Sequence, residues 1–364
     1  MTVSDFPNTA SPTSYSIQFG QTLWDLGDLV LNARFAEALE RGIARYPILR
    51  TLRFAARVSL EALFDDIALN LGWKAQRMRS SQMLLDGEGL LISAHGTHKQ
   101  DYCSCFFKIW SDTPERAQEA MRRIESVAAD TRIREPMFAI DWNFLTGKGE
   151  LQSASIEELA DDVLLDEAYP EIAGGVHRFI GAYLDANETV LVVQGPPGTG
   201  KTRLIRAILG EISRRKGREA QALYTGDRKS LENDEIFVKF ITGWDDAFVV
   251  EDADHILRPR AQGNEHLHRF LAIADGVVRS QGRKIIFSTN LPNVGDLDDA
   301  LIRPGRCFAR LHVRELTHAE ADVVVATLCA GDDARAARSR ERLAQLGRRS
   351  AALADIYRSC ADAR

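Results

Sequence analysis

The segment QGPPGTGKT, from residue 194 to residue 202, carries residue types that bind a chain of phosphates. It has the spacing G-x-x-x-x-G-K-[ST], and it lies between an apolar stretch and a stretch of helical periodicity. Glycines let successive backbone N–H groups turn toward phosphate oxygens, and the following helix adds the positive end of its dipole. The residues expected to bind the phosphates are Gly195, Pro196, Pro197, Gly198, Thr199, Gly200, Lys201, Thr202 and Arg203.

Two side chains of this segment suit a nucleoside triphosphate with its metal ion. Lys201 would reach the β- and γ-phosphates, and the Thr202 hydroxyl would be a ligand of Mg²⁺. The alternative, a glycine-proline turn with a chance lysine, leaves the preceding strand and the following helix unexplained. We therefore expect ATP and Mg²⁺ as the cofactors.

Acidic residues follow a second apolar stretch, FVVEDADHI, at residues 248–256. The carboxyl ends of parallel strands meet at one edge of a sheet, so Glu251 and Asp252 are expected beside the phosphate segment. A strand that simply runs into a solvated acidic turn is the alternative. The phosphate segment upstream argues against that alternative.

An amide and two guanidinium groups complete the set of reactive side chains. Asn290 follows the apolar stretch KIIFST, and a neutral amide there can orient an attacking water. Arg303 and Arg306 bracket a Pro-Gly turn and could stabilise charge on a transferred phosphoryl group. Because this turn cannot easily fold back to its own site, both arginines are better placed for the site of a neighbouring copy.

The elements expected to position these groups begin near residue 168, where short apolar strands alternate with helices. This pattern is typical of a parallel sheet with helices on its faces. The tail from Glu315 shows helical patterns only, and we assign it to a small helical lid. The expected strands are 189–194, 220–225, 247–252 and 284–289.

The residues before this region predict an α+β domain. Thr113 and Pro114 suit the N-cap and first position of a helix over 112–130, and Ser155 and Glu158 have the spacing of a capping box. We expect helices at 22–43, 59–73, 112–130 and 155–165, and strands at 75–85, 89–96, 102–111 and 137–145. The expected domains are 1–165, 166–314 and 315–364.

The composition of the 364 residues is that of a globular protein, with 45% hydrophobic residues and a net charge of -6. This acidic balance argues against a dedicated nucleic-acid binder, which usually carries a basic face. No apolar run is long enough to span a membrane, and the N-terminal residues lack the pattern of a signal peptide. The five cysteines are expected to be reduced thiols. We therefore expect a cytoplasmic protein.

Taken in order, the segments GPPGTGKT, FVVEDADHI, FLAIADGV, IIFSTN and LDDALIRPGR resemble the AAA subgroup of AAA+ ATPases over about residues 170–330. Within this subgroup the chain is most similar to the type of the mitochondrial translocase of the Rieske iron–sulfur protein, whose metal-binding strand also has the order Glu-Asp. The resemblance implies an α/β fold: a P-loop AAA+ core with a parallel sheet and a helical lid, preceded here by the α+β domain. It also implies a Mg²⁺-dependent ATPase that assembles into a homo-oligomeric ring, expected to be a hexamer.

The resemblance also implies roles for the residues that match its motifs. Glu251 takes the Mg²⁺-side position and Asp252 the position that polarises water. Asn290 takes the sensor position, and Arg303 and Arg306 take the arginine-finger positions that complete an adjacent protomer's site. An aspartate reaches about 1.5 Å less far than a glutamate, which matters for a positioned base. A sheet displaced slightly toward the nucleotide could compensate for the shorter side chain, and we therefore expect hydrolysis to be active.

One region departs from the threading members of the family. These carry an aromatic grip after the second strand, whereas this chain has the polar segment GDRKSLENDE at 226–235. Tyr224 is expected to end the strand before it, and Phe237, Phe240 and Trp244 are expected to lie in the core. The chain is therefore expected to remodel or translocate a protein partner without threading it through an aromatic pore.

Weaker patterns have plain structural alternatives. Two histidines and two cysteines lie close together along the chain and suggest a zinc site. Side chains alternate between the two faces of a strand, so Cys103 and Cys105 share one face, where free cysteines commonly serve as small apolar side chains. A structural role is favoured for His255, and His266 and His268 point in different directions on their expected helix. The arginines of the segment 333–346 are expected to form a solvated helix face. The suggested zinc ligands are His95, His98, Cys103 and Cys105.

Three functions remain open from the residues. The first is a ring ATPase whose N-terminal domain binds a protein client. The second is a DNA-associated loader or accessory ATPase, which the acidic balance disfavours. The third is a nucleotide-gated assembly switch with slow turnover.

Overall fold

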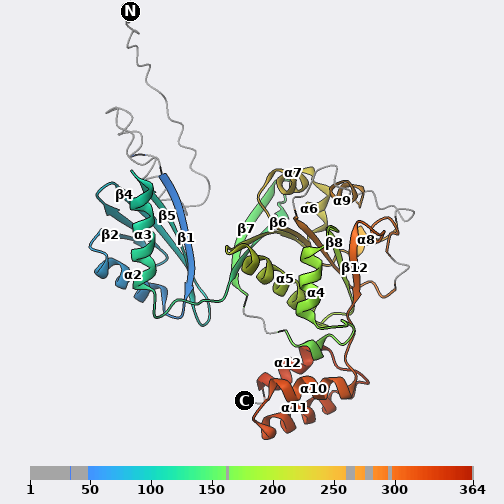
Figure 1. Cartoon of the computed structure of the whole chain (residues 1–364). Coiled ribbons are helices and arrows are strands. Elements are labelled where there is room, and N and C mark those ends of the chain that lie inside the picture. Colours follow the sequence, from blue (N-terminus) through green and yellow to red (C-terminus); the bar gives the residue numbers. More distant parts are fainter. Residues whose placement is uncertain are drawn as a thin grey trace, which may run out of the picture. The chain divides into compact units, whose positions relative to one another are not determined.

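The computed structural model describes residue 33 and residues 48–160, 164–259, 267–274, 282–293 and 297–362. The chain forms two compact units, Met1–Ile133 and Arg134–Arg364 (Figure 1). The boundary expected at residue 165 thus falls inside the second unit. The expected helix at 22–43 and the side chain of His266 lie outside the description, apart from residue 33, which is helical.

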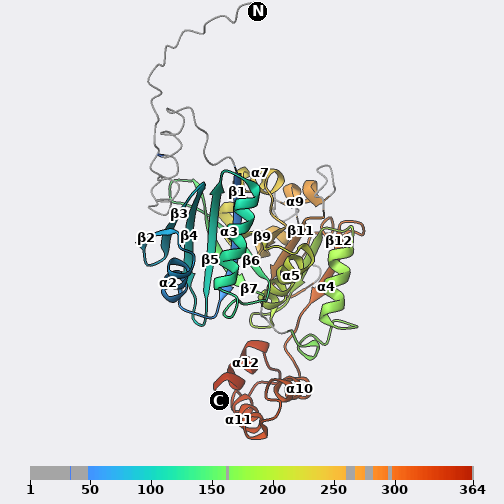
Figure 2. The ribbon, with the colours of Figure 1, turned by 60° about the vertical axis from the view of Figure 1, so that its left-hand side comes forward.

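The first unit is an α+β structure built on a five-stranded antiparallel sheet with the order β1-β5-β4-β3-β2. The helices α2 (Leu60–Asn70) and α3 (Pro114–Val127) lie on one face of this sheet (Figure 2). Alternate strand residues form the apolar core there. Thr113 caps the second helix by accepting from Arg116 N at 3.2 Å, as predicted. The elements are β1 (Ile48–Ala56), α2 (Leu60–Asn70), β2 (Lys74–Arg79), β3 (Gln82–Gly87), β4 (Leu90–His98), β5 (Cys103–Ser111) and α3 (Pro114–Val127).

The second unit contains a seven-stranded sheet with the order β12-β8-β11-β10-β9-β6-β7, parallel except for the last pair. Every residue of β8, β10 and β11 is buried, which explains the apolar runs at residues 190–193, 247–250 and 285–287. The strands are β6 (Met137–Leu145), β7 (Leu151–Leu159), β8 (Val190–Gln194), β9 (Ala220–Thr225), β10 (Ala247–Val250), β11 (Lys284–Thr289) and β12 (Cys307–His312).

The helix predicted at 155–165 is wrong, because residues up to Leu159 belong to β7. Ser155 pairs with Asp141 and Glu158 with Phe138 in an antiparallel ladder with β6, so the apparent capping box does not form. β6 in turn runs parallel to β9. An open sheet edge offered the segment 151–159 backbone partners, and this tertiary contact outweighed the local helical pattern.

Helices cover both faces of this sheet, and two apolar clusters form, one on each side (Figure 1). Leu204 and Ile208 of α5 pack into one cluster, and Phe240 of α7 and Phe270 of α9 pack into the other. The elements are η2 (Asp166–Ala168), α4 (Val176–Asp185), α5 (Lys201–Lys216), α6 (Arg228–Glu232), α7 (Asp234–Thr242), α8 (Asp254–Leu257) and α9 (Leu267–Ala274).

The tail is helical, as predicted. It consists of α10 (His318–Leu328), α11 (Asp333–Gln345) and α12 (Leu353–Asp362). A capping box between Thr317 and Glu320 begins α10. In the described part of the chain, no helix has the length and apolar character that a membrane crossing requires.

The polar segment after β9 carries the short helix α6, and α7 begins at Asp234. Tyr224 lies within β9, one residue before its end, close to the predicted position. Phe237 and Phe240 are buried as expected, but the expectation for Trp244 is wrong, because its side chain is 91% exposed. Trp244 follows the end of α7, so the helical periodicity that placed it in the core no longer applies.

Candidate functional site

The phosphate segment forms the turn between β8 and α5 at the carboxyl edge of the sheet. Gly200 has φ 94°, and a Cβ atom there would lie 2.7 Å from both Tyr169 Oη and Leu353 Cδ2. Tyr169 Oη donates to the Gly200 carbonyl at 3.0 Å. A side chain at Gly200 would therefore be strained and would displace both neighbours.

Lys201 extends back across this turn. Its Nζ donates to the carbonyl oxygens of Gly195 and Pro196 at 2.8 and 3.0 Å, and to Asn290 Oδ1 at 2.8 Å. Burial lowers the pKa of Lys201, while the carboxylates of Asp252, Glu251 and Asp254 oppose that shift. The ammonium is thus held at the mouth of the loop by acceptors that a phosphate oxygen can replace.

Glu251 follows β10 and is held through both of its carboxylate oxygens. Oε1 accepts a hydrogen bond from Thr202 Oγ1 at 2.6 Å. Oε2 accepts one from Tyr224 Oη, also at 2.6 Å. The hydroxyl and the carboxylate that were predicted to serve the metal therefore meet directly.

Asp252 has φ 49°, and it is the one non-glycine residue with a positive φ in the described ranges. Its Oδ1 accepts from Asn290 Nδ2 at 2.9 Å, and its backbone N–H donates to Ser288 Oγ at 3.3 Å. Left-handed backbone is disfavoured for an aspartate by about 1 kcal/mol or more. The ends of β10 and β11 hold Asp252 in this conformation.

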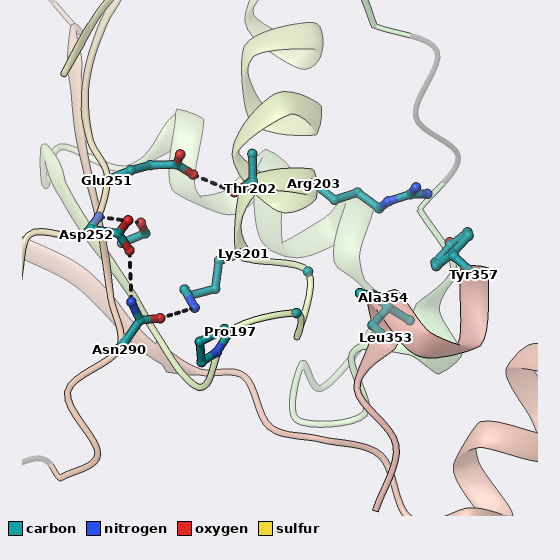
Figure 3. A pocket seen from close by; sticks show the side chains of 13 residues that line it. Pro197, Lys201, Thr202, Arg203, Glu251, Asp252, Asn290, Leu353, Ala354 and Tyr357 are labelled. Carbon is teal, nitrogen blue, oxygen red and sulfur yellow. Dashed lines mark hydrogen bonds between the residues drawn. The ribbon is translucent and has the colours of Figure 1, made fainter. Parts of the chain in front are cut away.

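A cavity of about 480 Å³ connects these groups (Figure 3). The structure brings together seven of the predicted side chains: those of Pro197, Lys201, Thr202, Arg203, Glu251, Asp252 and Asn290. The residues that line the cavity are Pro197, Gly198, Gly200, Lys201, Thr202, Arg203, Glu251, Asp252, Ser288, Asn290, Leu353, Ala354 and Tyr357.

The start of α12 closes one side of this cavity, which the sequence did not predict (Figure 3). Ala354 N donates to the Gly198 carbonyl at 2.9 Å. The Arg203 guanidinium lies 3.9 Å from the centre of the Tyr357 ring, a cation–π distance. No local motif marks these lid residues, because their contacts join segments about 150 residues apart.

The two predicted arginines do not line this cavity. Arg303 is exposed in the turn before β12. Arg306 is partly buried, and its guanidinium donates to the carbonyl oxygen of Ala300 in the same turn. The structure therefore separates both residues from the cavity of their own chain.

The zinc hypothesis finds no support in the described ranges, where no group of three or more potential ligands comes together. Cys103 and Cys105 are buried in the core of the first unit, with their sulfur atoms 4.0 Å apart. His95 Nε2 bonds Ser93 Oγ at 3.0 Å, and His98 Nε2 bonds Glu61 Oε1 at 3.1 Å. The histidines and the cysteines thus have separate partners.

Residues 191–315 match the model of the ATPase family associated with various cellular activities (AAA). The chain contains an AAA ATPase domain. This domain includes the phosphate segment at 194–202, the acidic residues Glu251 and Asp252 after β10, and the turn with Arg303 and Arg306. Its α/β fold is the one that the sequence predicted.

Three relatives illustrate the similarity of the AAA domain. The chain is 26% identical to the peroxisomal ATPase PEX6 of Dictyostelium discoideum over 70% of this chain and 20% of that protein. It is 31% identical to an ATP-dependent zinc metalloprotease YME1 homolog of Caenorhabditis elegans, over 43% and 21% respectively. It is 28% identical to the ATP-dependent zinc metalloprotease FtsH 1 of Rhodopirellula baltica, over 42% and 22%. The chain thus spans about a fifth of the length of these curated relatives.

The cavity fits a nucleoside triphosphate with Mg²⁺. Its volume lies in the range of small-molecule sites, and the glycine turn leaves backbone free to approach phosphates. The Thr202 hydroxyl and the Glu251 carboxylate are hard oxygen donors of the kind that Mg²⁺ prefers. Lys201 lines the same cavity and supplies a positive charge.

Proposed function

We propose that the chain hydrolyses ATP in a Mg²⁺-dependent reaction and uses the energy to remodel or translocate a protein partner. The observation that carries this proposal is the convergence of Lys201, Glu251, Asp252 and Asn290 on one cavity within the AAA domain. The relatives support it, since all three names describe ATP-dependent proteins.

Each group has a part in this reaction. Bound Mg²⁺ would neutralise charge on the phosphates. Lys201 binds the phosphates, and Thr202 and Glu251 hold the metal side of the site. The Asp252 carboxylate orients the attacking water and accepts its proton.

The inverted order of Glu251 and Asp252 is compatible with this reaction. The backbone of Asp252 is left-handed, and the Asn290 amide fixes one of its carboxylate oxygens at 2.9 Å. Backbone conformation and this hydrogen bond thus aim the shorter side chain, as positioned groups in catalysis require. The same order supports a place in the Rieske-translocase type of the AAA subgroup.

The decisive test is Asp252→Asn, which keeps the size and hydrogen bonding of the side chain but cannot accept the proton. We expect this variant to bind ATP as the unchanged protein does and to lose multiple-turnover phosphate release. A matched control is Asp185→Asn, which alters an exposed carboxylate paired with Arg215. Normal turnover in Asp252→Asn would disprove the assigned role, and slow turnover in the unchanged protein would favour the assembly switch.

We infer that the active form is a homo-oligomeric ring, expected to be a hexamer. The position of Arg303 and Arg306 supports this inference, because neither lines the cavity of its own chain. In such a ring, Arg303 of one copy would lie at the nucleotide cavity of the neighbouring copy. Sedimentation of the Asp252→Asn protein with ATP and with ADP would test the assembly.

The first unit is proposed to recognise the protein client. A non-hydrolysing Asp252→Asn ring should retain a client with ATP and release it with ADP. Equal retention with both nucleotides would contradict a nucleotide-driven cycle. The chain is not expected to act on nucleic acid, because its net charge is negative.

A further inference from the structure

Tyr224 of β9 reaches the acidic strand end from outside the cavity. Its hydroxyl donates to Glu251 Oε2 over 2.6 Å, the length of a strong hydrogen bond to a charged acceptor. The phenol hydroxyl is the donor of this bond, and the Glu251 carboxylate accepts it.

The Tyr224 ring is itself held in place. Trp142 of β6 meets it edge to face, with ring centres 5.4 Å apart and an interplanar angle of 72°. The two residues are direct partners in the parallel ladder between β6 and β9, and Tyr224 pairs with Val249 of β10 on the other side. The strands β6 and β10 therefore flank β9 on its two sides and fix the position from which the Tyr224 hydroxyl reaches Glu251.

Glu251 needs such a restraint more than an aspartate would. A glutamate has one additional rotatable bond, and the rotation of its carboxylate group is broad and poorly restricted. Thr202 bonds to one carboxylate oxygen and Tyr224 to the other, so the two bonds together fix this rotation. When Thr202 serves the metal, the bond from Tyr224 can remain.

We propose that Tyr224 is a positioning residue, whose hydroxyl fixes the Glu251 carboxylate in the orientation that supports Mg²⁺ beside Thr202. This proposal rests on the proposed function, since it concerns the metal side of the same nucleotide site. It also explains how a glutamate occupies that side. Partners that orient metal-binding carboxylates commonly affect metal affinity about 10-fold or more.

The test is Tyr224→Phe, which removes the hydroxyl and keeps the ring against Trp142. Binding of a fluorescent ADP analogue is measured first in EDTA and then at rising Mg²⁺ concentration. We expect unchanged affinity in EDTA and an Mg²⁺ midpoint about 10-fold higher. If the hydroxyl had only a structural role, its removal would not raise the Mg²⁺ midpoint while leaving the affinity in EDTA unchanged.

Tyr183→Phe is the matched control, because the Tyr183 hydroxyl also donates hydrogen bonds, but to the carbonyl oxygens of Thr189 and Ile285 and not to Glu251. It should leave the Mg²⁺ midpoint unchanged. In a Glu251→Ala background, Tyr224→Phe should have no further effect, which identifies Glu251 as the group through which it acts. Thermal unfolding of each variant checks that the fold is intact.

An unchanged Mg²⁺ midpoint in Tyr224→Phe would overturn the inference, as would an equal shift in Tyr183→Phe or an additive effect in the Glu251→Ala background. If Tyr224→Phe failed to fold, the comparison of Glu251→Ala with Glu251→Asp would decide. The shorter aspartate cannot keep the bond to Tyr224 but still offers a carboxylate, so Glu251→Asp should raise the Mg²⁺ midpoint by less than Glu251→Ala does. An unchanged midpoint in Glu251→Asp would overturn the inference. Absence of nucleotide binding by the unchanged protein would instead refute the proposed function.

Discussion

Asn290 joins Asp252 to Lys201 through a single amide group. Its Nδ2 donates to Asp252 Oδ1 at 2.9 Å, and its Oδ1 accepts from Lys201 Nζ at 2.8 Å. The backbone N–H of Asn290 donates to Asp254 Oδ1 at 2.9 Å, which fixes the residue at the end of β11. The proposed proton acceptor and the proposed phosphate-binding lysine are therefore positioned by the same side chain.

Asn290→Asp separates the two halves of this contact. An aspartate keeps an oxygen for Lys201 but replaces the donor to Asp252 with a second negative oxygen. We expect nucleotide affinity within a few-fold of the unchanged protein and a turnover rate lower by roughly 100-fold, since Asp252 loses its orientation. Phosphate release and equilibrium nucleotide binding measure the two effects. Equal losses in both would show that the residue serves binding alone.

Arg303 and Arg306 are expected to differ. Arg303 is exposed, so Arg303→Ala should keep stability and nucleotide binding while turnover falls by about 100-fold or more. Arg306 donates to Ala300 within its own turn, so Arg306→Ala should also lower stability. Mixing Arg303→Ala with Lys201→Ala should restore part of the activity, because some interfaces then combine an intact cavity with an intact Arg303. No recovery on mixing would contradict action between copies.

The stacking of Arg203 on Tyr357 should contribute to nucleotide affinity by holding α12 against the phosphate loop. Tyr357→Phe keeps the ring and is expected to bind nucleotide normally. Tyr357→Ala should weaken binding about threefold to tenfold, in line with about 1 kcal/mol for a partly exposed cation–π pair. Titration with a fluorescent nucleotide compares the two variants. Equal affinities would show that the lid contact is unimportant for binding.

The stability of the lid should depend on pH through Glu320. The Arg314 guanidinium, together with hydrogen bonds from Thr317, lowers the pKa of Glu320 to about 2. Because the folded pKa lies below the unfolded one, the carboxylate stabilises the fold above the unfolded value of 4.5, and this is lost as the pH falls toward 2. Glu320→Gln should lower the unfolding free energy by about 0.5 kcal/mol at pH 7. Urea unfolding should show this difference shrinking below pH 4.5; a constant difference would contradict the assignment.

Local sequence determined the parts of the site that depend on neighbouring residues. The spacing from Gly195 to Thr202 specified a turn and a helix start, because glycine conformations and the helix N-terminus act over a few residues. Continuous apolar runs specified buried parallel strands, and strand ends then placed Glu251, Asp252 and Asn290 at one sheet edge. The fold class and the candidate site were predictable for this reason, while the roles of the site residues stay predictions.

Tertiary structure alone decided the rest, because it depended on contacts between distant segments. The segment around Ser155 has a helical pattern, yet it pairs with β6 and forms a strand. This strand extends the seven-stranded sheet of the second unit. The pairing of β6 with β9 placed Trp142 against Tyr224. The neighbouring position of β9 and β10 placed Tyr224 within hydrogen-bond distance of Glu251. α12 reached the phosphate loop in a similar way. Hydrogen bonds and packing formed on folding select such partners, and no residue spacing along the chain encodes them.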